Sequence, residues 1–88
     1  MTQMTGMDVQ QVRQLAQQMS NGAQQIRALQ QQLSSQLEAT PWEGADKQRF
    51  VGEWTGTHVR NLIAVATSLE TASTDANRNA EQQDAASS

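Results

Sequence analysis

The chain of 88 residues contains no cysteine and no tyrosine, and it has only one histidine and one proline. Without cysteine there is no thiolate nucleophile and no disulfide, and a single histidine cannot build a zinc-type ligand cluster. The sequence also offers no nucleophile beside a base, no catalytic carboxylate pair and no phosphate-binding loop. We therefore expect no metal, no cofactor and no enzymatic activity, and a fold that depends on apolar packing.

Charge and long apolar runs are scarce as well. Charged residues make up 17% of the chain and the net charge is −3 at pH 7, so no positive field attracts nucleic acid or anionic lipid. No segment approaches the roughly 20 apolar residues of a membrane span, and residues 1–7 lack the features of a cleavable signal peptide. Nucleic-acid and membrane partners are therefore disfavoured, and export would need a route without such a signal.

A regular helical pattern is what the first half of the chain does contain. Asp8 is a good N-cap, with Gln11 as its capping-box partner. From there apolar residues recur every three or four positions, namely Val9, Val12, Leu15, Met19, Ala23, Ile26, Leu29, Leu33 and Leu37. Pro41 ends the pattern because it disfavours helical geometry at Thr40. The sequence predicts a flexible segment at 1–7, a helix over 8–39 and a turn at 40–44.

A second helix is predicted over residues 45–82, followed by a flexible end at 83–88. Its apolar positions are Phe50, Val51, Trp54, His58, Leu62, Val65, Leu69, Ala72, Ala76 and Ala80. Because His58 lies near the centre of this stripe, we expect it to be buried as a neutral imidazole at a helix or subunit interface. Mild acid would then charge the ring and loosen the fold.

Two long helices joined by a five-residue turn must fold back on each other, so the fold class is all-α: residues 1–88 form a single antiparallel helical hairpin. Each apolar stripe covers an arc of about 120°, which one helix–helix contact cannot cover. We therefore expect dimerisation into a four-helix bundle, and the low surface charge favours a homodimer. The expected core and dimer residues are Leu15, Met19, Ile26, Leu29, Leu33, Phe50, Trp54, His58, Leu62, Val65 and Leu69.

The segment between the two predicted helices carries Trp42-Glu43-Gly44, followed by Ala45, Phe50 and Trp54. The sequence resembles the WXG proteins of about one hundred residues, the ESAT-like substrates of type VII secretion. The resemblance consists of this motif, its position between the two predicted helices and the length of the chain. The resemblance covers nearly the whole chain. It implies a homodimer, or a heterodimer with a paralogous WXG protein, as an antiparallel four-helix bundle. It also implies export without a cleaved signal, mostly from actinobacteria and other Gram-positive bacteria.

The same resemblance implies roles for particular residues. Trp42 and Gly44 would form the turn and an export-recognition motif read by the secretion ATPase. Family members or their partners often carry a C-terminal Tyr-x-x-x-Asp/Glu signal. Here Ala80 stands at the tyrosine position and Asp84 at the acidic position, which makes this a degenerate export signal.

Three functions are weighed on this basis. The favoured one is a secreted substrate or adaptor, cytoplasmic before export, that acts through protein–protein interaction. The alternative is a cytoplasmic escort that pairs with the hairpin of a larger type VII effector before export. A membrane-active helix pair is disfavoured by the acidic charge and by the few basic residues on the polar faces.

Overall fold

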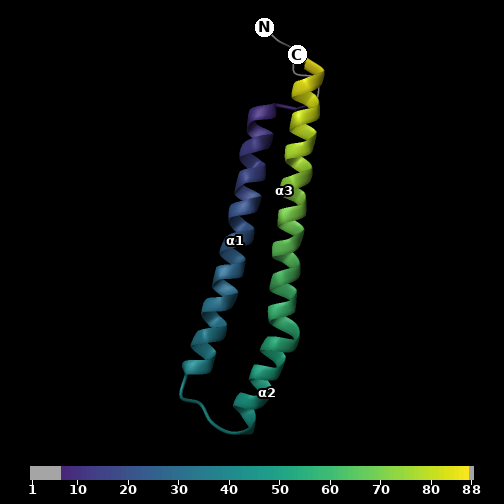
Figure 1. Ribbon diagram of the computed structural model, residues 1–88. Coiled ribbons are helices and arrows are strands. Elements are labelled where there is room, and N and C mark those ends of the chain that lie inside the picture. Colours follow the sequence, from purple (N-terminus) through teal and green to yellow (C-terminus); the bar gives the residue numbers. More distant parts are fainter. Residues whose placement is uncertain (1–6, 88) are drawn as a thin grey trace.

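The chain forms a long helical hairpin. In a computed structural model, which describes residues 7–87, the elements are α1 (Val9–Ala39), α2 (Ala45–Glu53), the π-helical turn η1 (Trp54–His58) and α3 (Val59–Ser87). The last three follow one another without a break and run antiparallel to α1, with the connecting loop at one end of the molecule (Figure 1). The prediction of an all-helical hairpin is confirmed. Dimerisation stays a prediction.

The ends of the helices follow from local contacts. At the start of α1, Asp8 Oδ1 accepts a hydrogen bond of 3.1 Å from the backbone N–H of Gln11. The second helix extends beyond its predicted end at residue 82, because α3 continues to Ser87, and the flexibility of residues 83–87 stays a prediction. The last turns of α3 are held against α1 by buried Ala80 and by the ion pair between Arg13 and Asp84 at 3.5 Å. The predicted flexibility of residues 1–6 and 88 lies outside the described residues.

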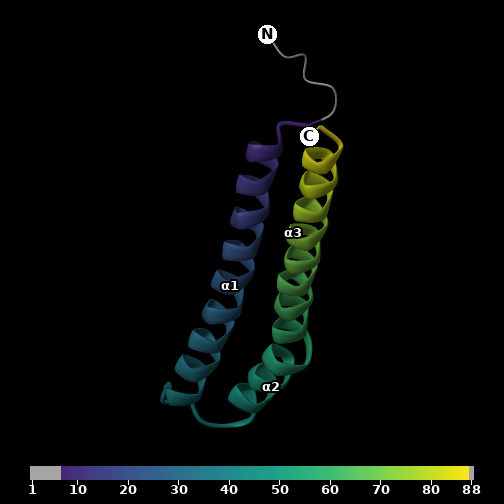
Figure 2. The ribbon, with the colours of Figure 1, turned by 45° about the horizontal axis from the view of Figure 1, so that its top comes forward.

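The hairpin is narrow and elongated, with principal extents of 67 × 17 × 15 Å. Its radius of gyration is 19.6 Å, whereas a compact domain of this length has about 12 Å. The turned view in Figure 2 shows only two helical layers, lying side by side along most of their length. A single line of contact between α1 and α3 therefore provides the interior of this chain.

That line of contact is made of small side chains. Among the described residues, the buried apolar ones are all alanine, and the buried polar one is Ser73, which is 7% exposed. These residues recur at intervals of seven in each helix, and we call them the small-residue seam: Ala16, Ala23, Ala66, Ser73 and Ala80. Ser73 Oγ donates a 2.7 Å hydrogen bond across the seam to the carbonyl oxygen of Ala16. The helices thus approach closely, with a polar contact that fixes their register.

The large apolar residues of the predicted stripes lie beside the seam rather than in it. Met19, Ile26, Leu62 and Leu69 are half-buried, whereas Leu15, Leu29, Leu33, Phe50 and Val65 are exposed. Three seam residues, Ala16, Ala66 and Ser73, were not among the predicted apolar positions. The predicted apolar stripe of each helix therefore lies to one side of the observed line of contact. The stripe was placed by the bulky residues, and these do not form the contact.

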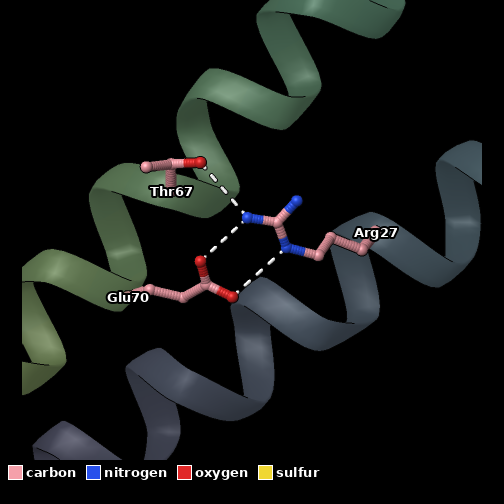
Figure 3. A network of polar contacts seen from close by, with 3 residues as sticks. All are labelled: Arg27, Thr67 and Glu70. Atoms are coloured by element: carbon pink, nitrogen blue, oxygen red, sulfur yellow. Dashed lines mark hydrogen bonds and ion pairs between the residues drawn. The ribbon is translucent and has the colours of Figure 1, made fainter.

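One side of the seam is closed by ion pairs. At about 100° per residue, the position four residues after a seam residue lies on one side of the contact. Arg27, Glu70 and Asp84 occupy such positions, after Ala23, Ala66 and Ala80 respectively. Arg27 binds Glu70 through two hydrogen bonds of 2.8 and 3.2 Å and donates a third, of 3.2 Å, to Thr67 Oγ1 (Figure 3). We call Arg13, Arg27, Glu70 and Asp84 the ion-pair flank.

The opposite side of the seam is apolar. The residue directly before a seam position lies about 100° from that position in the other direction, farther round the helix than the ion-pair positions, which lie at about 40°. On α1 this is true of Leu15 and Gly22, with Leu29 seven residues further on, and on α3 of Val65 and Ala72. The ion pair Arg27–Glu70 joins positions that have the same spacing from a seam residue on each helix. Positions with equal spacing on the two helices therefore lie on the same side of the seam, and this holds for these five residues as well. We call them the apolar flank.

The π-helical turn shifts the phase of the second helix. The N–H of Val59 donates to the carbonyl of Trp54, five residues back, so one extra residue is accommodated. Before this turn Val51 and Trp54 are half-buried, and after it Val59 and Leu62 are. His58 is exposed in the single hairpin, so its own two helices do not bury it, and burial at a subunit interface stays a prediction. The expectation that the hairpin itself buries His58 assumed uninterrupted α-helical phase.

The Arg27–Glu70 contact predicts a dependence of stability on pH. Hydrogen bonds from Arg27, followed by its charge, hold the pKa of Glu70 below its ordinary value of 4.5, while partial desolvation acts in the opposite sense. A carboxyl with a lowered folded pKa stabilises the fold above the unfolded pKa, and this contribution is lost as pH falls through the folded pKa. Below about pH 4.5, Glu70→Gln should therefore lose less stability than the wild type.

Thermal melts between pH 7 and pH 3 measure this difference. Asp75→Asn is the matched control, because Asp75 pairs with Arg78 within α3 and does not join the two helices. The control should keep the acid dependence of the wild type. An acid dependence in Glu70→Gln equal to that of the wild type would contradict the assignment.

Candidate functional site

The candidate site is the closed end of the hairpin, where the chain leaves α1. Thr40 has extended backbone geometry, and its Oγ1 donates a 2.7 Å hydrogen bond to the carbonyl of Gln36. The ammonium of Lys47 on α2 donates to the carbonyl of Thr40 at 3.1 Å. Hydrogen bonds from both sides therefore fix the start of the turn that holds Trp42-Glu43-Gly44.

Gly44 has a backbone conformation that other residues adopt only with strain. Its φ is 105° and its ψ is −173°, a region that is essentially restricted to glycine. Its carbonyl accepts a 3.3 Å hydrogen bond from the N–H of Gln48, at the start of α2. A Cβ atom at Gly44 would meet nothing within 4 Å. The turn therefore needs glycine for its backbone freedom and not for space.

Trp42 lies on the surface of this turn. Its ring packs against Phe50 with centroids 5.3 Å apart and an interplanar angle of 53°. Trp42 is 37% exposed and Phe50 is 45% exposed. Such a pair contributes about 0.5 to 1.5 kcal/mol beyond area burial. The two rings thus form an apolar tip that is ordered by one contact and open to solvent.

Trp54 has a different role, because it joins the second helix to α1. Its Nε1 donates a 2.9 Å hydrogen bond to Ser34 Oγ, and Gln30 Nε2 donates to the same oxygen at 2.9 Å. The ring is half-buried and lies 6.0 Å from the imidazole of His58. Trp54 therefore anchors the π-helical turn on α1, whereas Trp42 makes no such connection between the long helices.

An apolar groove separates the end of α1 from α2 and the π-helical turn. It has a volume of about 300 Å³ and is lined by Leu33, Gln36, Leu37, Thr40, Phe50 and Trp54. We call it the turn-end groove. No lining side chain is charged, and Gln36 lies seven residues after Leu29 on the same side of α1. The groove therefore continues the apolar flank to the tip of the hairpin.

Asp84 does not join this site within one chain. It lies near the open end of the hairpin and pairs with Arg13, whereas Trp42 and Gly44 lie in the loop at the other end (Figure 1). Ala80 is buried in the small-residue seam, so the position aligned with the family's tyrosine faces α1. The two parts of the expected export signal are separated by the length of the hairpin.

The described residues contain no group of three or more His, Cys, Asp or Glu side chains that could hold a metal ion. Within the same part of the chain, no helix has an apolar stretch long enough to cross a bilayer. The apolar features of the described surface are the Trp42–Phe50 tip, the turn-end groove and the apolar flank.

No family model, curated protein or solved structure matches the chain. The resemblance to the WXG proteins therefore depends on the motif itself and on its setting. The structure adds that the tryptophan is exposed and that the glycine has the backbone conformation this turn requires. The groove beside the motif was not predicted, because it arises from the separation of α2 from the end of α1.

The conformation of Gly44 predicts contrasting effects of two glycine substitutions. Gly44→Ala should lower the free energy of unfolding by about 1 to 3 kcal/mol, because alanine is strained at this φ and ψ. Gly52→Ala should raise it by up to about 1 kcal/mol, because Gly52 lies within α2 and an added Cβ meets nothing within 4 Å. Urea unfolding of both variants measures the difference. Equal effects at the two positions would contradict the role given to Gly44.

Proposed function

We propose that this protein is a substrate or adaptor of a type VII secretion system and that it acts through protein–protein interaction. The observation that carries the proposal is the Trp42-Glu43-Gly44 motif at the tip of a helical hairpin. Gly44 supplies the turn conformation, and Trp42 presents an apolar ring beside Phe50. A surface that is held in place and rich in exposed aromatic area suits recognition by another protein.

In this proposal the secretion ATPase recognises the tip in the cytoplasm, and the protein is exported without removal of a signal sequence. The ring of Trp42 provides the recognition contact. Asp84, as the acidic half of the C-terminal signal, contributes from a second chain. An antiparallel pair of hairpins would bring the open end of one chain beside the tip of the other, which would offset the separation of Asp84 and Trp42 within one chain.

Dimerisation into a four-helix bundle is part of the same proposal. The support is the shape of the chain and its exposed leucines, because a hairpin with a seam of small residues leaves large apolar side chains in water. The second hairpin is another copy of this chain or a paralogous WXG protein. Neither metal nor nucleic acid has a part in this mechanism.

A second candidate function is favoured by the apolar flank. A cytoplasmic escort would use this surface to cover the apolar stripe of a larger effector until that effector is exported. The two functions differ in where the protein accumulates. A substrate leaves the cell through the secretion ATPase, whereas an escort that is not exported stays in the cytoplasm.

The different contacts of the two tryptophans predict separate effects on export and stability. Trp42→Ala should reduce export severalfold while lowering the unfolding free energy by less than Trp54→Ala does, because it removes packing against Phe50 but no hydrogen bond to α1. Trp54→Ala is the matched control, with a loss of about 2 to 3 kcal/mol, since it removes half-buried ring area and the hydrogen bond to Ser34.

Mass spectrometry of cells and culture medium, with and without the secretion ATPase, measures export, and thermal melts measure stability. The proposal expects the wild type in the medium only when the ATPase is present. Retention of the wild type in cells under both conditions would favour the escort. If Trp42→Ala unfolds the protein as severely as Trp54→Ala does, the recognition role of Trp42 has no support.

A further inference from the structure

Gly22 is a glycine that the hairpin itself does not require. It lies inside α1, where glycine is less favourable than alanine by about 1 kcal/mol. Among the described residues, the left-handed backbone region is occupied only by Gly44, so Gly22 has no need of that freedom. A Cβ at Gly22 would meet Leu69 Cδ1 at 3.7 Å, an ordinary van der Waals distance. With no side chain of its own, Gly22 is a low point of the apolar flank, bordered on one side by the Leu69 side chain, and we call this low point the hollow.

Two exposed leucines border this hollow. Leu15 and Leu29 lie seven residues before and after Gly22, on the same side of α1, and they are 51% and 50% exposed. The only charged residues between positions 9 and 37 are Arg13 and Arg27, and both belong to the ion-pair flank. A second copy of α1 could therefore approach the apolar flank without burying charge or meeting repulsion, although the chain is acidic overall.

The exposed area of the chain is sufficient for such a contact. The chain exposes 6571 Å², whereas a compact monomer of 9.6 kDa exposes about 5,100 Å². The difference is about 1,500 Å², and a stable protein–protein interface buries about 800 Å² on each partner. The elongated hairpin therefore has enough additional surface for a second copy to cover.

We infer that a second copy of this chain packs antiparallel on the apolar flank, with Leu29 of each copy seated in the hollow at Gly22 of the other. This inference rests on the dimer of the proposed function and specifies its register. In an antiparallel pair, seven residues back along one copy lie opposite seven residues forward along the other. Leu15 of one copy, seven residues before Gly22, therefore faces Gln36 of the other copy, seven residues after Leu29. Leu15 then lies over the turn-end groove. One register thus fills both depressions with the two most exposed leucines of the described chain.

The neighbouring register is less favourable for a physical reason. If Gly22 faced Gly22 of the second copy, Leu15 would face Leu29, and the bulky side chains would hold the two helices apart. The hollows would then lie opposite each other and the turn-end groove would remain empty. Unfilled apolar space forfeits dispersion contacts on every side. Pairing a leucine with a glycine across the interface avoids this loss.

Disulfide cross-linking of the full chain tests the register, because the protein contains no cysteine of its own. Gly22→Cys and Leu29→Cys proteins are prepared separately, shown to be helical by circular dichroism, mixed and oxidised. A disulfide needs Cα atoms about 4.4 to 6.8 Å apart, so the mixture should form cross-linked dimer severalfold faster than either variant alone. Leu15→Cys mixed with Gln36→Cys should behave in the same way. Ala28→Cys mixed with Gly22→Cys is the control and should cross-link slowly.

Fastest cross-linking of Gly22→Cys with itself would overturn the inferred register and leave the dimer and the proposed function standing. Absence of cross-linking in all mixtures, with a folded monomer in sedimentation, would overturn the inference together with dimerisation. A failure of export, measured by mass spectrometry, would leave the cross-linking result unaffected. The register and the proposed secretion function are therefore tested separately.

Discussion

The close contact between α1 and α3 over small side chains determines the rest of this structure. Alanine and serine at intervals of seven residues bring the two helices together, and a hydrogen bond from Ser73 to the Ala16 carbonyl fixes their alignment. The large apolar side chains lie beside this contact, where they are half-buried or exposed. One side is then closed by Arg27, Glu70 and the second ion pair, while the other side exposes leucine and valine.

Much of the fold could be predicted from the sequence because its signals are local. The apolar period gives two helices, Asp8 begins the first, and Pro41 with Gly44 marks the turn. The seam was harder to predict, because an apolar stripe is defined by its bulky members and these lie beside the contact. The phase change at the π-helical turn, which exposes His58, and the long-range pair that holds the end of α3 leave no periodic signal.

The candidate site divides in the same way. Trp42 and Gly44 could be identified from the motif, and the structure gives each a physical character: an exposed ring and a backbone conformation that needs glycine. The turn-end groove depends on how far α2 lies from the end of α1, which no sequence pattern reports. In the proposed mechanism the tip serves recognition and the apolar flank serves pairing, so the two surfaces of one hairpin have separate tasks.

The central claim is that the apolar flank is completed by a second hairpin. Sedimentation equilibrium of the purified chain, over about 1 to 100 micromolar, tests this claim most directly, because a monomer has a mass of 9.6 kDa. The account predicts a species of about twice this mass and a folded monomer when Leu29 on the apolar flank is replaced by glutamate. A wild-type chain that is folded and has the monomer mass at every concentration would contradict it.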